Sequence, residues 1–319
     1  MNLNILQTKL NIPPLRPLIV QRRRLLETLD QGLSQHLRLT LISAPAGSGK
    51  TTLLAHWLET LSQPAAWISL DTTDNDPIQF ITYLITSLQN VKPAVGDSIL
   101  QTIGSGMDSG NINSGRVETI LQPLINDLIQ IDHPLILVLD DYHVIENPTI
   151  HSAINFLINN LPPNAYVVIS TRSDPSLHLA NLRARGQIVE IRATDLRFTL
   201  PESTTFLNDT MKLKLTSDEV ASLEKRTEGW IAGLQLAATS LQSQTNIPEF
   251  IENFSGSNRF ILDYLLEEVL RFESEERYSF LLTTSILNRI TGTLCDALTE
   301  HSNGQAMLEQ LENLRHEVK

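Results

Sequence analysis

The sequence predicts an α/β fold in which a parallel sheet, covered by helices on both faces, carries a P-loop and is followed by an all-helical region. Three observations predict this fold. Short apolar segments alternate with segments of helical spacing as far as about residue 197, a pattern typical of parallel sheets. A glycine-rich segment ending in Gly-Lys-Thr joins the first predicted strand to the next helix. After Arg197 only helical spacing continues.

The elements can be predicted in order along the chain. Residues 1–24 form an extended arm, because Pro13, Pro14 and Pro17 disfavour regular helix. Residues 92–115 are rich in Gly, Ser, Asp and Asn, which predicts a surface loop. Strands are predicted over residues 38–43, 65–70, 134–139, 165–170 and 187–191, and helices over residues 25–32, 51–61, 77–88 and 117–131.

The region after the sheet consists of helical segments from Pro201 to the end of the chain. We place a domain boundary near residues 198–200, where the strand pattern stops. A weaker boundary falls near residues 255–275, where polar segments interrupt the apolar periodicity. At 319 residues the chain is long enough for two or three compact units.

Composition narrows the function classes. Asp and Glu total 36 against 24 Lys and Arg, a net charge of −12, which argues against a dedicated nucleic-acid surface in this piece. Cys295 is the only cysteine, so no disulfide can form within the chain. The first residues lack the pattern of a signal peptide, and the apolar run Leu135–Leu139 is far too short to cross a bilayer. We therefore expect a cytoplasmic protein without a membrane partner.

The segment Ala44–Thr51 has the pattern of a P-loop between a strand and a helix. Gly47 and Gly49 allow the backbone to curl so that amide groups point at phosphate oxygens. We expect Lys50 to reach the outer phosphates and Thr51 to ligate Mg²⁺. The alternative is a glycine-rich turn that only joins strand to helix. The predicted nucleotide-binding residues of this segment are Pro45, Ala46, Gly47, Ser48, Gly49, Lys50, Thr51 and Thr52.

Two carboxylates, Asp140 and Asp141, directly follow an apolar strand. In open α/β sheets, ligands bind at the carboxyl ends of the strands. We expect Asp140 to act on the Mg²⁺ side together with Thr51, and Asp141 to polarise the attacking water. His143 is a candidate to orient Asp141 or to sense the phosphate. The alternatives are a polar strand cap for the carboxylates and an ordinary surface position for the histidine.

Arg172 follows the next predicted strand. An arginine at this strand end can stabilise charge that develops on the outer phosphoryl group, and its planar fork suits that role. The alternative is a surface arginine paired with Asp174.

Five blocks of the sequence, in order, resemble the MalT-like group of bacterial ATP-dependent transcriptional regulators, which are LuxR-type activators of the STAND class of signalling ATPases. The resemblance runs from about Thr8 to about Leu311. The blocks are TKLNIPPLRPLIVQRRRLL, SAPAGSGKTTLLAHWL, LVLDDYH, ISTRSDPSLHLANLRARGQIVEIRATDLRF and EGWIAGLQLAA.

The resemblance implies an arm over residues 1–24, a nucleotide-binding domain over 25–199, a small helical domain over 200–272 and a truncated winged helix over 273–319. It further implies a switch in which ADP holds a closed resting state, while inducer and ATP open it and drive self-association. DNA would be bound only through a C-terminal domain absent from this chain.

The same resemblance implies roles for single residues. Lys50 and Thr51 match the Walker A pair, and Asp140 and Asp141 match the Walker B pair, with Asp141 as the catalytic acid. His143 matches a histidine implicated in hydrolysis, Arg172 matches the sensor arginine, and Val20 and Arg22 match positions near the nucleotide base. This sequence departs from other STAND proteins at Gln235, where many have a proline.

Three functions stay open on the sequence. The first is a nucleotide-operated switch with ATP or ADP and Mg²⁺ as cofactors and slow hydrolysis as its reset. The second is an ordinary P-loop enzyme, such as a small-molecule kinase or a motor. A kinase needs basic residues in a lid over the phosphates, but residues 92–115 contain only one lysine, Lys92, and no arginine. The third is an interaction module that binds nucleotide without hydrolysing it.

Overall fold

The structure is a computed structural model. It describes residues 5–61, 63–105, 114–242, 244, 246–254, 259–268, 274–287, 289–299 and 301–316. The chain forms two compact units. The first consists of Met1–Ala44 and Lys50–Asp195, and the second of Pro45–Gly49 and Leu196–Lys319.

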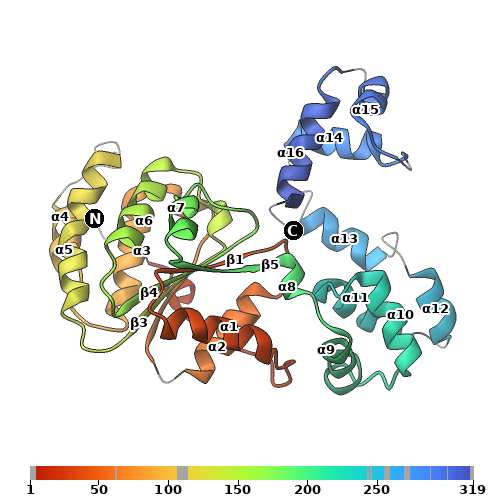
Figure 1. Cartoon of the computed structure of the whole chain (residues 1–319), viewed down its shortest axis with the longest axis horizontal. Helices are drawn as coiled ribbons and strands as arrows, with labels where there is room; N and C mark the ends of the chain where they lie inside the picture. The colour runs from red at the N-terminus through yellow and green to blue at the C-terminus, as the bar shows by residue number, and fades with distance from the viewer. Residues whose placement is uncertain are drawn as a thin grey trace. The chain divides into compact units, whose positions relative to one another are not determined.

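The first unit contains a five-stranded sheet in which every pair of neighbouring strands is parallel. The strand order is β2-β3-β4-β1-β5, so the strand that precedes the P-loop lies between β4 and β5 (Figure 1). The parallel sheet predicted from the sequence is confirmed, and each strand lies within two residues of its predicted bounds. The strands are β1 (Leu39–Ser43), β2 (Ala65–Ser69), β3 (Leu135–Asp140), β4 (Ala165–Thr171) and β5 (Ile188–Arg192).

Burial along the strands follows their place in the sheet. Every residue of β1, β3 and β4 is buried, whereas the edge strands β2 and β5 are partly exposed. Strands with helices on both faces have no solvent side, and their apolar residues therefore run continuously instead of alternating. This explains why the segments Leu135–Leu139 and Ala165–Ile169 are almost entirely apolar.

Helices cover both faces of this sheet. The helices α1 and α2 pack together, and α3, α5 and α6 form a separate group, with the two groups on opposite sides of the strands in Figure 1. Both α3 and α6 begin at a proline that follows a capping side chain, Asp76 and Asn147 respectively. The helices of the first unit are α1 (Arg23–Ser34), α2 (Lys50–Thr60), α3 (Pro77–Gln89), α4 (Asp97–Gly104), α5 (Ser114–Ile129), α6 (Pro148–Asn160) and α7 (Leu179–Ala184), while α8 (Ala193–Leu196) spans the junction.

The predicted surface loop over residues 92–115 is corrected in part. Helix α4 occupies Asp97–Gly104, and Gly96 precedes it with a φ of +74°. Its side chains Ile99 and Ile103 are buried, because their spacing of four residues places them on one face. Residues 106–113 of the predicted loop lie outside the described residues.

The predicted extended arm also needs a correction. A 3₁₀ helix, η1 (Gln7–Leu10), interrupts it, and helix α1 begins at Arg23. Lys9 is buried and forms an ion pair with Asp74, which lies in η2 (Thr72–Asn75) and is fully buried. Leu10 packs into the main core. The arm is therefore anchored to the sheet unit by both charge and apolar contact.

The second unit is helical after its loop segment. Thr199 and Thr216 each form a capping box with a glutamate three residues later, and the rings of Phe198 and Phe206 pack 5.5 Å apart. Its elements begin with α9 (Leu200–Thr204), the π-helical turn η5 (Thr205–Thr210), α10 (Ser217–Thr227), α11 (Ile231–Leu241), α12 (Ile247–Asn253) and α13 (Arg259–Glu268).

Three more helices complete the described part of this unit: α14 (Glu275–Thr284), α15 (Gly292–Thr299) and α16 (Gly304–His316). Phe280, Cys295 and Met307, one from each helix, form a small apolar core. The predicted boundary between residues 272 and 273 lies outside the described residues. Among the helices that the structure describes, none combines the length and the apolar character that a membrane span requires.

Candidate nucleotide-binding site

The predicted P-loop lies between a strand and a helix, as its motif requires. Strand β1 ends at Ser43 and helix α2 begins at Lys50. Between them, Gly47 and Gly49 have φ values of +73° and +80°, which favour glycine because a Cβ atom is strained in the left-handed region. The segment therefore has the curled backbone expected of a phosphate-binding loop.

Lys50 lies buried in the first turn of α2, and its Nζ donates a hydrogen bond of 2.7 Å to the Ala44 carbonyl. The pKa of Lys50 is lowered to about 8, chiefly by burial and also by the charge of Arg172, against the opposing charges of Asp141 and Asp140. Burial disfavours the charged form of the Lys50 ammonium group, and a nearby anion favours that form. A bound anion such as phosphate would therefore stabilise the charged lysine.

The hydroxyl of Thr51 meets the carboxylate of Asp140 at the end of β3. Thr51 Oγ1 donates a hydrogen bond of 2.8 Å to Asp140 Oδ2, and Ser170 Oγ donates to Asp140 Oδ1. Asp140 is only 2% exposed. Burial and the charge of Asp141 raise the pKa of Asp140 to about 6, against the opposing effect of the two hydroxyl groups and Lys50. A buried carboxylate beside a hydroxyl matches the oxygen ligands that Mg²⁺ takes.

Ser170 was not among the residues singled out from the sequence. It ends the predicted strand 165–170, and the strand register places it beside the last residue of β3. Its hydroxyl also accepts a hydrogen bond of 3.2 Å from the backbone N–H of Asp141. A polar residue at the carboxyl end of a central strand was the signal that could have identified it.

Asp141 adopts a left-handed conformation with a φ of +58°, which is uncommon for a residue other than glycine. Its side chain is 44% exposed, and His143 Nδ1 lies 3.7 Å from Asp141 Oδ1. The pKa of His143 is lowered to about 3, mainly by burial and in addition by the charges of Arg172 and Lys50. The imidazole is therefore neutral at pH 7, so the contact with Asp141 is not an ion pair.

Arg172 immediately follows β4, and its charge acts on both Lys50 and His143. The structure therefore brings these three predicted residues together at one edge of the sheet. Asp174, the alternative partner for Arg172, forms ion pairs with Arg183, at 2.9 Å, and with Arg192. The charges of Lys50 and Arg172 disfavour each other. A polyphosphate that neutralises both would fit this edge of the sheet.

The two predicted arm residues lie in the first unit. Val20 is half-buried, while Arg22 is buried and its Nη2 donates a hydrogen bond of 3.2 Å to the carbonyl of Asp195. The Arg22 carbonyl accepts hydrogen bonds from the first turn of α1. These contacts fix the point where the arm enters α1, and the role of both residues near a nucleotide base stays a prediction.

The loop residues Pro45–Gly49 belong to the second unit, where they contact the start of α11. Trp230 Nε1 donates a hydrogen bond of 3.1 Å to the Ala46 carbonyl, and the Ala232 N–H donates one of 3.0 Å to the Gly47 carbonyl. The sequence of this helical block resembles the MalT-like family, but no local pattern in it indicates a contact with the loop.

Gln235, where many STAND proteins have a proline, lies on α11. Its Nε2 contacts Met211 Sδ at 3.6 Å and Thr239 Oγ1 at 3.4 Å. These are weak contacts on the helix surface.

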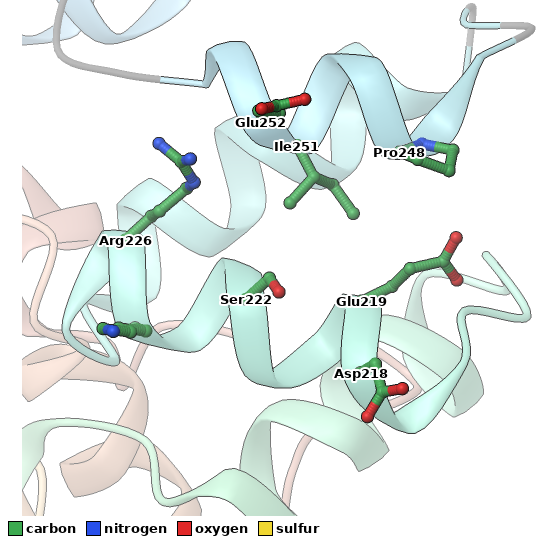
Figure 2. A pocket seen from close by; sticks show the side chains of 8 residues that line it. Asp218, Glu219, Ser222, Arg226, Pro248, Ile251 and Glu252 are labelled. Carbon is green, nitrogen blue, oxygen red and sulfur yellow. The ribbon is translucent and has the colours of Figure 1, made fainter.

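The helical unit also contains a groove of about 610 Å³ between α10 and α12. Figure 2 shows Ser222 and Ile251 facing each other across it, with acidic Asp218 and Glu219 toward one end and Arg226 toward the other. The groove contains none of the predicted phosphate or metal residues. Its volume alone therefore does not make it a nucleotide site.

Two family models match the chain. The model described as an AAA ATPase domain matches residues 20–170, and the model described as a MalT winged helix domain matches residues 266–316. The first match includes the P-loop and the end of β3, and it stops one residue before β4 ends. The second includes the three helices α14, α15 and α16.

Curated relatives match nearly the whole chain. An HTH-type transcriptional regulator MalT of Yersinia pestis (strain Pestoides F) is 35% identical over 314 residues, which cover 97% of this chain and 33% of that protein. A serine/threonine-protein kinase PknK of Mycobacterium tuberculosis (strain ATCC 25618 / H37Rv) is 33% identical over 298 residues, 92% of this chain and 26% of that protein. The chain thus spans about a quarter to a third of the length of these relatives.

Among solved structures, a Walker-type ATPase of Pyrococcus abyssi is similar, with a TM-score of 0.57, 14% sequence identity, and coverage of 95% of this chain and 93% of that chain. At this identity the likeness shows the fold alone. It agrees with the P-loop sheet and helical region described above.

Proposed function

Because this chain belongs to the MalT-like family and corresponds to the N-terminal ATPase portion of these regulators, we propose that it is the nucleotide-operated core of a bacterial transcriptional activator. ATP binding is the signal, and slow hydrolysis to ADP is the reset. The ATP state favours self-association. DNA is contacted by another part of the full regulator, in keeping with the name of the MalT relatives and the net charge of −12 in this piece.

The meeting of Thr51 and Asp140 carries the proposal. Their oxygens lie 2.8 Å apart, which places the end of the P-loop and the acidic strand end at one point. Lys50 lies near both carboxylates, since the charges of Asp141 and Asp140 act to raise its pKa. A turn that merely joined strand to helix would not require a buried carboxylate and a buried ammonium group at this point.

The residues divide the work as follows in our proposal. Lys50 binds the outer phosphates, and Thr51 with Asp140 holds Mg²⁺, which when bound neutralises phosphate charge. Asp141 orients and polarises the attacking water from its exposed position. Arg172 stabilises charge on the outer phosphoryl group. Neutral His143 can donate or accept a hydrogen bond without adding charge to the site.

A direct experiment is denaturing extraction of the purified protein, followed by chromatography of the released nucleotide. We expect ADP or ATP in a fixed ratio to protein. A protein that releases no nucleotide and gains no thermal stability with Mg-ADP or Mg-ATP would contradict the proposal, because ligand that binds only the folded state must stabilise it.

Two substitutions separate the steps. Lys50→Ala should abolish nucleotide binding, since it removes the ammonium group that binds the outer phosphates. Asp141→Ala should keep ATP binding but abolish ATP hydrolysis. The variant should therefore accumulate in the self-associated ATP state, which light scattering measures. Asp209→Ala, on the helical turn η5, is a control outside the proposed site and should change neither property. Equal ATP hydrolysis by Asp141→Ala and the parent would contradict the assigned role of Asp141.

The kinase alternative has one observation in its favour, which is the match to relatives named serine/threonine-protein kinases. The chain covers only 26% of that protein, so the activity in its name does not transfer to the aligned part. Incubation with radiolabelled ATP and candidate acceptors distinguishes the two. A switch releases inorganic phosphate, whereas a kinase labels an acceptor.

A further inference from the structure

The start of helix α11 binds two consecutive carbonyl groups of the P-loop. Trp230, the residue before the helix, donates its indole N–H to the Ala46 carbonyl at 3.1 Å. Ala232, in the first turn, donates its backbone N–H to the Gly47 carbonyl at 3.0 Å. All four residues belong to the second unit. The loop is thus bound on its carbonyl side by one short segment of the helical region.

Peptide geometry gives these two bonds a consequence. In a trans peptide the C=O and the following N–H point in opposite directions, and the loop peptides are trans. When the Ala46 and Gly47 carbonyls point at α11, the N–H groups of Gly47 and Ser48 point away from it. Amides of this part of a P-loop bind phosphate oxygens. Holding the carbonyls therefore orients the phosphate donors.

The packing leaves little room for another arrangement of the indole. A Cβ atom added at Gly47 would lie 2.4 Å from Ala232 Cβ and 3.1 Å from Trp230 Nε1, and one added at Gly233 would lie 2.6 Å from Trp230 Cε3. The ring of Tyr264, on α13, meets the Trp230 ring edge-on at a centroid distance of 5.6 Å. The two glycines allow the indole to lie against the loop, and Tyr264 supports it.

We propose that Trp230 and Ala232 are positioning residues for phosphate binding, and that docking of the α11 start on the P-loop and nucleotide binding therefore strengthen each other. This inference rests on the proposed nucleotide-binding function. By linkage, the docked segment strengthens nucleotide binding by the same free energy by which bound nucleotide strengthens docking of the segment. Phosphate bound at the P-loop thus stabilises the contact between the loop and the start of α11.

Trp230→Phe tests the proposal, because it removes the indole N–H and keeps an aromatic ring. Gly233→Ala is a second variant that keeps the N–H but displaces the indole. Trp67→Phe is a matched control, since buried Trp67 donates its own indole N–H at 2.8 Å to Ser69 in the first unit. Isothermal titration calorimetry measures binding of Mg-ADP and of Mg-pyrophosphate, which has no base, and thermal unfolding confirms that each variant is folded.

We expect Trp230→Phe and Gly233→Ala to weaken binding of both ligands by about three- to tenfold, the range that one lost hydrogen bond gives. Trp67→Phe should stay within about twofold of the parent. Unchanged binding by both test variants would overturn the inference. So would an equal loss in Trp67→Phe, which would indicate general destabilisation, or a loss for ADP without one for pyrophosphate, which would place the effect at the base.

Lys50→Ala distinguishes this failure from failure of the proposed function. If the parent binds Mg-ADP, Lys50→Ala does not, and Trp230→Phe binds as well as the parent, the nucleotide site stands and only the positioning role is lost. If the parent binds neither Mg-ADP nor Mg-pyrophosphate, the proposed function and the inference fail together.

Discussion

The hydroxyl of Thr51 donates a hydrogen bond of 2.8 Å to the carboxylate of Asp140. This bond joins the first turn of α2 to the last residue of β3, although strand β4 lies between β3 and the strand that precedes the P-loop. The other carboxylate oxygen accepts from Ser170 on that intervening strand. Three neighbouring elements thus supply oxygens at one point on the sheet edge, which is the basis for the first two predictions.

Thr51→Val should weaken nucleotide binding only when Mg²⁺ is present. The substitution keeps the shape of the side chain but removes the proposed metal ligand, so we expect Mg²⁺ affinity of the complex to fall about 10- to 100-fold. Binding of ADP in EDTA should change little. Calorimetry with and without Mg²⁺ measures both. Thr40→Val removes another buried hydroxyl, one that bonds Tyr166, and is the control. An equal loss of affinity in EDTA would contradict the metal role.

Asp140→Asn should stabilise the protein without ligand at neutral pH. Burial and the charge of Asp141 raise the pKa of Asp140 from 3.8 to about 6. A carboxyl with a raised folded pKa adds stability below its unfolded pKa, and that stability is lost as pH rises through the folded pKa. This stability is lost mainly between pH 4 and pH 6, and the total loss approaches about 3 kcal/mol. Asparagine does not ionise, so the advantage of Asp140→Asn over the parent should grow by roughly 1.5 kcal/mol between pH 5 and pH 7.5.

Urea denaturation at the two pH values measures that difference, and the comparison with the parent cancels effects of other groups. Saturating Mg-ADP should reverse the order, because the parent then gains the binding free energy that Asp140→Asn lacks. If the difference in free energy of unfolding between the ligand-free proteins does not change with pH, ionisation of Asp140 does not destabilise the folded parent, and the prediction is wrong.

Arg172→Gln should raise the pKa of His143. Burial is the larger cause of the low value, about 3, and the charges of Arg172 and Lys50 add to it. Removing one of these charges should move the pKa upward, while burial keeps it below the usual value for histidine. The His143 ring resonance in a pH titration by NMR measures the shift. Arg183→Gln is a control, because the ion pairs of Arg183 are with Asp174 and Glu190; a similar shift there would indicate a long-range effect of net charge.

The sequence was sufficient to predict the sheet and its strand-end residues, for a physical reason. Central strands such as β3 are buried on both faces, and their apolar runs end abruptly at the first residues that need water or ligand. Asp140 is the last residue of β3, Asp141 follows it, and Arg172 follows β4. The fold class is confirmed, whereas the functional roles of these residues stay predictions.

Other features could not be read from the sequence because they depend on contacts between distant segments. The polar residues around α4 masked a helix whose buried face has only a few apolar side chains, among them Ile99 and Ile103. The hydrogen bond from Trp230 to Ala46 spans 184 residues, and no local pattern indicates such a pair. The buried position of Lys9 likewise depends on Asp74, 65 residues away.

Lys9→Met should destabilise the first unit, because it leaves Asp74 fully buried without its cation. Asp74 keeps a hydrogen bond of 2.8 Å from the Asp71 N–H and one of 3.1 Å from Gln79 Nε2, so we expect a loss of about 3 kcal/mol, near the low end for a broken buried pair. Urea denaturation followed through tryptophan emission measures it, since Trp57 and Trp67 both lie in this unit. Lys92→Met, on an exposed lysine, should change stability by less than about 0.5 kcal/mol.

The double variant Lys9→Met with Asp74→Asn separates the effect of charge from the effect of packing. If the cost of Lys9→Met arises from an uncompensated carboxylate, replacing that carboxylate by its neutral isostere should recover a large part of the loss, since a buried charge without a partner costs more than the pair contributes. If the two substitutions simply add, the loss comes from the other contacts of Lys9, which are packing of its stem, the ion pair with Asp71 at 2.9 Å and the Tyr83 ring, whose centroid lies 4.9 Å from the ammonium group. An unchanged unfolding midpoint for Lys9→Met alone would show that the arm does not depend on this ion pair for its anchoring.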